Sequence, residues 1–217
     1  MVEPVIVELA VNGATPRHRN RHVPRTPAEI TEAALAGLEL GASIVHNHND
    51  EPMFSADGVH AVEPYLTACR PVRQRHPDAL PYPTMAAGAR GIPEARRWAH
   101  VEELARQGMG GMTLVDPGSV NLGLTSAGAV AADAADGPYA NSLADVEYMF
   151  ARSGELGPRP ASRSSSRGSC GLRGPGEPSN LDLLRAAVAV VEGLGRAPAT
   201  AAQARRILGV PFSPRRV

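Results

Sequence analysis

The first two thirds of the chain alternate between short apolar runs and longer stretches with apolar residues at helical spacing. Four apolar runs predict strands at 5–10, 43–45, 80–83 and 111–115. Helical spacing predicts helices after them at 27–40, 58–75, 93–107 and 141–155. This alternation is typical of a parallel sheet covered by helices. The polar residues after the strands then gather where (β/α) barrels keep their chemistry.

Two helix starts carry a complete capping signal. Thr26 is placed as an N-cap, with Pro27 in the first turn and Glu29 in the capping-box position. Thr200 and Gln203 repeat the box before a short last helix. Both helices are therefore expected to begin at these residues.

The strand–helix pattern breaks after residue 157. Residues 158–178 are rich in Pro, Arg, Ser and Gly, so neither strand nor helix is expected there. Helical spacing returns at 180–194. We therefore divide the chain into strand–helix units at 1–157, an irregular segment at 158–178, and C-terminal helices of the same domain within 179–217.

Composition narrows the class of protein. The 217 residues include 22 Lys+Arg and 22 Asp+Glu, so no charge excess favours nucleic acid or an anionic membrane surface. No apolar run approaches the roughly 18 residues of a membrane span. Cys69 and Cys170 form no zinc or redox motif, which indicates a reducing compartment. A cytoplasmic protein without nucleic-acid or membrane partners is expected.

His46 and His48 stand where the strand at 43–45 ends. Side chains alternate faces along a strand, so the two imidazoles are expected to point the same way. Imidazole suits zinc, and a catalytic zinc takes three protein ligands and keeps one open position. The alternative is a pair of ordinary loop histidines. We favour half of a metal site.

Several stretches in the right order resemble the β-keto acid cleavage enzymes, also called 3-keto-5-aminohexanoate cleavage proteins. The similar stretches are 26–30, 41–48, 116–123, 141–142, 194–200 and 204–209. The resemblance covers roughly residues 4–157 and 176–210. It implies a (β/α)8 TIM barrel, zinc, and a homo-oligomer. It also implies a reaction of lysine degradation type, in which a β-keto acid and acetyl-CoA give acetoacetate and the CoA ester of the shortened acid.

The resemblance also implies roles for particular residues. His46 and His48 match the two histidine ligands of the family's metal. Residues that match substrate contacts are Thr84, Thr113, Asp116, Ser119 and Asn121. The implied partners are a small β-keto acid and a CoA thioester. Thr15 stands where family members can carry a Glu.

The late part of the chain departs from the family. The family's third ligand is a Glu in an Arg-x-Gly-Leu-Glu-Asp motif, and the nearest remnant here, 171–174, has no acid. Asp50, Glu8 and Glu51 are the alternative third ligands. A complete barrel takes about 250 residues, so an incomplete barrel is expected. No general base is identified.

Residues 159–171 are interpreted as family sequence read in a shifted frame. Loss of one base after the Pro160 codon, with GC-rich codons, turns a family-like fifth strand into the sequence seen here. A natural flexible linker is the alternative. Both predict disorder over 158–178, because little apolar surface is available there to offset chain entropy.

Two other functions stay open beside the zinc-dependent cleavage enzyme. One is a catalytically incompetent remnant or assembly partner, because the late strands are missing. The other is a different aldol- or Claisen-type metallolyase, because 46–50 resembles the His-x-His-Asn-Asp box of acyl-CoA metallolyases.

Overall fold

The protein is an alternating α/β chain, seen in a computed structural model that describes residues 3–13, 17–18, 20–50, 59–85, 92–117, 119–121, 138–162 and 178–211. Its strands are β1 (Glu8–Ala10), β2 (Ile44–Asn47), β3 (Leu80–Pro83), β4 (Met112–Val115), β5 (Val120–Asn121), β6 (Pro138–Tyr139) and β7 (Arg159–Ser162). Its helices are α1 (Pro27–Glu39), α2 (Val62–Arg75), α3 (Glu94–Arg97), α4 (Ala99–Arg106), α5 (Leu143–Leu156), α6 (Asn180–Gly193) and α7 (Ala201–Leu208). The expected strand–helix alternation is confirmed.

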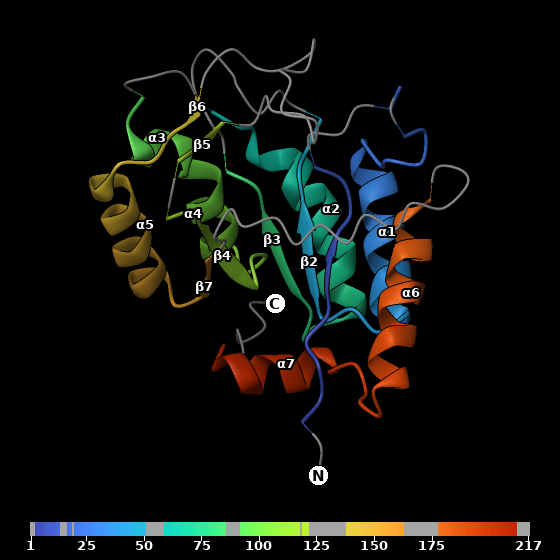
Figure 1. The fold of residues 1–217 in the computed structure, drawn as a ribbon. Helices are drawn as coiled ribbons and strands as arrows, with labels where there is room; N and C mark the ends of the chain where they lie inside the picture. The colour runs from blue at the N-terminus through green and yellow to red at the C-terminus, as the bar shows by residue number, and fades with distance from the viewer. Residues whose placement is uncertain are drawn as a thin grey trace.

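The central strands are parallel and lie in chain order (Figure 1). β2 pairs with β1 and β3, which places His46 level with Tyr82. β4 pairs with β7, and Gly111 N donates to Pro81 O at 2.7 Å to bring β4 beside β3. A Cβ at position 111 would lie 2.5 Å from Leu80 Cα, so this approach requires glycine. The two short strands β5 and β6 form a separate antiparallel pair.

The expected parallel α/β sheet is confirmed, but it is not a closed barrel in the part of the chain that the structure describes, where no pairing joins β7 to β1. The prediction that 158–178 contains no strand is wrong for β7. Its sequence carries no strand pattern, and it becomes a strand by pairing with the edge of β4 while Ala161 packs on the core. The remainder of the segment, 163–177, lies outside the described residues.

Several helix boundaries follow the local signals. Both capping boxes, at Thr26 and Thr200, are formed. The helix expected at 93–107 is instead divided into α3 and α4 at Trp98, whose indole Nε1 donates to Leu114 O at 2.9 Å. α2 is continuous through Pro71, so the proline there does not end the helix.

Hydrophobic side chains fill both faces of the sheet. One cluster packs the sheet against α1, α2 and α6 and contains Val7, Leu9, Val11, Ile30, Ala34, Ala42, Val45, Ala68, Val72, Ala79 and Leu184. A second cluster joins β3 and β4 to α4, α5 and α7, and includes Leu80, Tyr82, Trp98, Val101, Leu114, Met149 and Ala204. Among the described helices none is long and apolar enough to cross a membrane.

Helix α7 lies across the lower end of the sheet (Figure 1). Arg205 on this helix binds the turn before β3. Arg205 is 2% exposed. Its guanidinium donates to three backbone carbonyls, Asp78 O at 2.7 Å, Ala79 O at 3.2 Å and Pro211 O at 2.8 Å. A buried cation with this many charge-assisted hydrogen bonds holds the helix firmly in place.

The residues before β1 are hydrogen-bonded to the segment between α6 and α7. Val5 forms an isolated parallel bridge with Pro198, Val5 N donates to Ala197 O at 2.9 Å, and Ala199 N donates to Val5 O at 2.7 Å. Arg196 adds two hydrogen bonds to Glu3 O across a separation of 193 residues. These hydrogen bonds join the segment between α6 and α7 to the residues before β1.

Candidate active site at the carboxyl ends of the strands

His46 and His48 lie next to each other at the carboxyl end of β2. Their ring centroids are 5.2 Å apart, with an interplanar angle of 81°. His46 is buried, and its ring lies 4.6 Å from that of Tyr82 on β3, centroid to centroid. The structure therefore brings together the two histidines that the sequence proposed as ligands.

Asn12, in the loop after β1, fixes the backbone of His48. Asn12 Oδ1 accepts from His48 N at 2.7 Å, and Asn12 Nδ2 donates to His48 O at 3.0 Å. The same amide nitrogen donates to Pro24 O at 3.2 Å. Sequence analysis missed Asn12, although an amide side chain directly after a strand signals this kind of backbone contact. The histidine pair is thus tied to the neighbouring loop.

The alternative third ligands are placed as follows. Glu8 Oε1 accepts from Tyr82 Oη at 2.7 Å. Asp50 is largely exposed and lies 3.6 Å from the guanidinium of Arg25, while Glu51 lies outside the described residues. Across the described part of the chain, no group of three His, Cys, Asp or Glu side chains is arranged to hold a metal ion. The described residues thus fit two of the three protein ligands of a catalytic zinc and do not supply the third.

Thr84, at the carboxyl end of β3, lies beside the histidine strand. Its N–H donates to Asn47 O at 2.9 Å. Its carbonyl accepts from His100 Nε2 at 2.6 Å. Burial lowers the pKa of His100 to about 3 despite this hydrogen bond, and nearby His60 lowers it further. Thr84 is therefore held from both sides, by β2 and by α4.

A second group forms around Asn141, between β4 and α5. Asn141 Nδ2 donates to Asp116 O at 3.0 Å, and Asn141 N donates to Ser119 Oγ at 3.1 Å. Arg97 Nη2 donates to Asn141 Oδ1 at 2.9 Å. Asp116 and Ser119, both predicted substrate contacts, are thus brought to one loop cluster.

The other two predicted contacts on this side are placed differently. Thr113 is fully buried, and its hydroxyl is 2.8 Å from Ser153 Oγ on α5. That contact gives Thr113 a place in the packing of β4 against its helix. Asn121 lies on β5, and its side chain lies outside the described part of the structure.

Glu94 and Arg97 form a buried ion pair on α3 that the sequence did not reveal. Their nearest charged atoms are 2.9 Å apart, and each side chain is 4% exposed. Burial raises the pKa of Glu94 to about 7, against the lowering effect of Arg97, and Asp145 and Asp116 raise it further. A glutamate next to an early helical arginine is ordinary in sequence, so only the packing discloses this pair.

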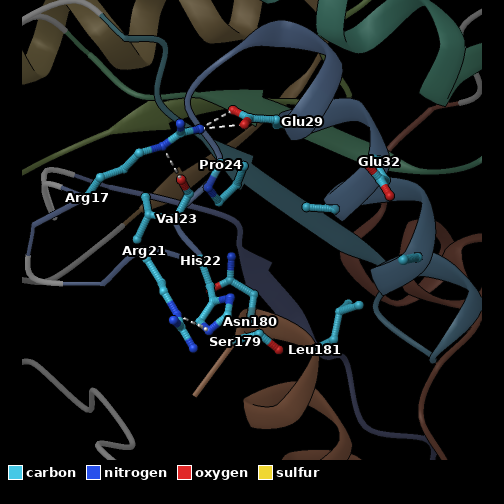
Figure 2. Close-up of a pocket in the computed structure, with 12 residues that line it drawn as sticks. Arg17, Arg21, His22, Val23, Pro24, Glu29, Glu32, Ser179, Asn180 and Leu181 are labelled. Atoms are coloured by element: carbon cyan, nitrogen blue, oxygen red, sulfur yellow. Dashed lines mark hydrogen bonds and ion pairs between the residues drawn. The ribbon is translucent and has the colours of Figure 1, made fainter. Parts of the chain in front are cut away.

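A pocket of about 340 Å³ lies at the start of α1 and α6, beside the loop after β1. Figure 2 shows Arg17 in contact with the Glu29 carboxylate, and Arg21 beside His22 on another part of the wall. Glu32 also lines it. The wall therefore carries side chains of both signs and does not select an ion of one charge.

A parallel α/β sheet with histidines and polar side chains at the carboxyl ends of its strands is the arrangement of α/β enzymes that keep their active site at this edge. Residues 4–167 match the beta-keto acid cleavage enzyme family. This chain belongs to that family, and the match runs further into the irregular segment than the resemblance alone indicated.

Comparison with individual proteins gives shorter or more distant likenesses. The 3-oxoadipate:acetyl-CoA acetyltransferase of Cupriavidus necator is 40% identical over 60 residues, which are 26% of this chain and 21% of that protein. This chain thus matches about a fifth of the relative's length. The apo structure of ObcA is 17% identical at a TM-score of 0.46, covering 65% of this chain and 30% of that chain. The ternary complex of ObcA with C4-CoA adduct and oxalate is 20% identical at a TM-score of 0.46, covering 65% and 31%.

Proposed function

We propose that this protein transfers an acyl group between a β-keto acid and acetyl-CoA, giving acetoacetate and the CoA ester of the shortened acid. The observation that carries the proposal is the adjacent His46–His48 pair at the strand ends of a chain in this family. The named relative, an acetyl-CoA acetyltransferase of 3-oxoadipate, supports the same substrate class.

We assign His46 and His48 to a divalent metal, zinc by family resemblance. Zinc in such a site is a Lewis acid that polarises a carbonyl oxygen. The chain's own contribution is positioning. Asn12 fixes the backbone of His48, and the hydrogen bond from Thr84 N to Asn47 O keeps the ends of β2 and β3 in register. The proposed keto acid contact at Thr84 lies next to the histidine strand for this reason.

Asp116 and Ser119 are the proposed substrate contacts on the other side of the site. Both belong to the loop cluster around Asn141, which holds them by hydrogen bonds. Thr113 and Asn121 stay proposed contacts from the resemblance alone, and the bond from Thr113 to Ser153 favours packing over substrate contact.

The particular β-keto acid is proposed to be 3-keto-5-aminohexanoate, which places the protein in lysine degradation in the cytoplasm. The competing substrate is 3-oxoadipate, whose far end is a carboxylate, whereas 3-keto-5-aminohexanoate ends in a methyl group and carries an ammonium group on the carbon before it. The rates at which one preparation turns over each of the two acids therefore show which of them is the better substrate.

A second candidate is a remnant without activity that serves as an assembly partner. Two observations favour it: the described residues supply two metal ligands only, and the described sheet is open. An open parallel sheet leaves unpaired backbone at its edges, which favours self-association. We propose a homo-oligomer in either case.

The deciding experiment incubates the purified full chain with each β-keto acid, with and without acetyl-CoA and Zn²⁺, and quantifies acetoacetate. Production that requires acetyl-CoA supports the cleavage enzyme. Cleavage of an acyl-CoA substrate without any β-keto acid would instead indicate a different metallolyase. Absence of product in every condition, from folded protein, would leave the assembly partner as the function.

A further inference from the structure

Three buried aromatic side chains behind the strand ends have no part in the function proposed so far. His60 lies two residues before α2, Tyr65 is in its first turn, and His100 is the second residue of α4. Ring centroids are 5.2 Å apart for His60 and His100, and 5.3 Å apart for Tyr65 and His100. None of the three is more than 4% exposed.

Tyr65 and His100 each contact the backbone near the end of a strand. Tyr65 Oη accepts from Asn49 N at 3.3 Å, in the residue after His48, and also bonds His60 Nδ1 at 3.2 Å. His100 Nε2 bonds the carbonyl of Thr84 at 2.6 Å. The cluster therefore touches the loop that carries His48, and it also touches Thr84, the proposed binding residue for the β-keto acid.

We propose that Tyr65 and His100 are positioning residues, which set the backbone at Asn49 and Thr84 and so fix the distance between the metal-binding loop and the keto acid contact. This inference rests on the proposed function for its meaning. The two hydrogen bonds themselves exist whether or not the chain is an enzyme.

The chemistry of His100 makes its bond a fixed one. A carbonyl oxygen only accepts, so His100 donates its Nε2 proton to Thr84. Its strongly lowered pKa keeps the ring neutral around pH 7, so that proton is the only N–H the ring carries. A buried ring with a single N–H makes this hydrogen bond in one orientation, and a positioning residue needs such a fixed orientation.

The test compares amide hydrogen exchange in the full chain and its variants. Tyr65→Phe removes the acceptor for Asn49 N–H while keeping the ring. The loss of one hydrogen bond predicts roughly fivefold faster exchange at Asn49. His100→Leu removes the donor to the Thr84 carbonyl. The Thr84 amide itself bonds Asn47 O, so its exchange is expected to rise because the end of β3 loses its support from α4 and opens more often.

His100→Gln is the conservative variant, because its amide keeps an N–H donor of similar reach. It is expected to restore slow exchange at Thr84, which a purely space-filling role for His100 does not predict. Tyr148→Phe is the matched control. Tyr148 also loses one hydrogen bond, to Glu102 on α4, and should leave Asn49 and Thr84 unchanged.

Turnover supplies a second readout. His100→Leu is expected to reduce kcat/KM for the β-keto acid about tenfold, with the KM for acetyl-CoA unchanged and activity recovered in His100→Gln. If the wild-type chain turns over no β-keto acid, the proposed function fails and the exchange measurement still decides the positioning role. Wild-type exchange rates in both Tyr65→Phe and His100→Leu would overturn the inference, as would a failure of His100→Gln to rescue.

Discussion

Tyr82 on β3 donates from its hydroxyl to Glu8 on β1 at 2.7 Å, across the strand that carries His46. The ring of Tyr82 also lies against the ring of His46, with 4.6 Å between the two centroids. Glu8, one of the three alternative third ligands, therefore accepts a hydrogen bond that links the first and third strands.

We expect Glu8→Gln to retain the metal content of the wild-type chain, because a glutamine oxygen still accepts from Tyr82. His46→Ala combined with His48→Ala is expected to abolish metal retention, since it removes both proposed ligands. Metal per chain is measured by inductively coupled plasma analysis after gel filtration. A loss of metal in Glu8→Gln would make Glu8 the third ligand.

Arg205→Ala should destabilise the fold by about 3 kcal/mol, because three backbone carbonyls lose a charged donor from a buried side chain at once. Arg206→Ala is the matched control, since Arg206 is exposed on the same helix, and a surface change of this kind is worth less than about 0.5 kcal/mol. Urea denaturation measures both. Equal midpoints for the two variants would contradict the anchoring role of Arg205.

Glu94 predicts a fall in stability as pH rises. Its pKa is about 7 in the folded chain against an ordinary 4.5, so the folded state binds the proton more tightly between these values. The contribution is complete below pH 4.5 and is lost as pH rises through 7, with a total of about 3 kcal/mol. Glu94→Gln should flatten this part of the curve, so that its stability relative to wild type increases from pH 5 to pH 8. Parallel curves would place the titration elsewhere.

Glu102 predicts the opposite slope at acid pH. Hydrogen bonds from Arg152 and Tyr148 outweigh burial and lower its pKa to about 2 from 4.5. The stabilising effect is present above pH 4.5 and is lost as pH falls toward 2. We expect Glu102→Gln to cost about 2 kcal/mol at pH 7, where it breaks the α4–α5 network.

The control for this prediction is Glu103→Gln, in which the neighbouring, more exposed carboxylate is neutralised. Its unfolding free energy should stay close to that of the wild-type chain at every pH. The curves of Glu102→Gln and the wild type should converge near pH 2. A constant difference between them down to that pH would show that packing, and not the charge of Glu102, is responsible.

The parts of the fold that sequence predicted are those with local causes. Thr26 and Thr200 signal their helices through their own side chains. His46 and His48 are two residues apart at the end of a strand, and their ring centroids lie 5.2 Å apart. β7 was missed because its residues gain their conformation from the edge of β4.

The site shows the same division. Asn12 and His100 act through contacts with segments 36 and 16 residues away, so spacing alone does not reveal them. The Glu94–Arg97 pair lies within one helix, and only its burial distinguishes it from an ordinary surface pair. Thr113 stays a predicted substrate contact, and the contact of its hydroxyl with Ser153 on α5 is one that the sequence did not indicate.

The hydrogen bonds that join the residues before β1 to the segment between α6 and α7 have a consequence for synthesis on the ribosome. Glu3 and Arg196, which are joined by two hydrogen bonds, are separated by 193 residues. The segment before β1 therefore leaves the ribosome early and waits for the translation of 193 further residues before its partner exists. Contacts of such long sequence separation close last and slowly, so a nascent chain of this protein is expected to need protection of that segment during translation.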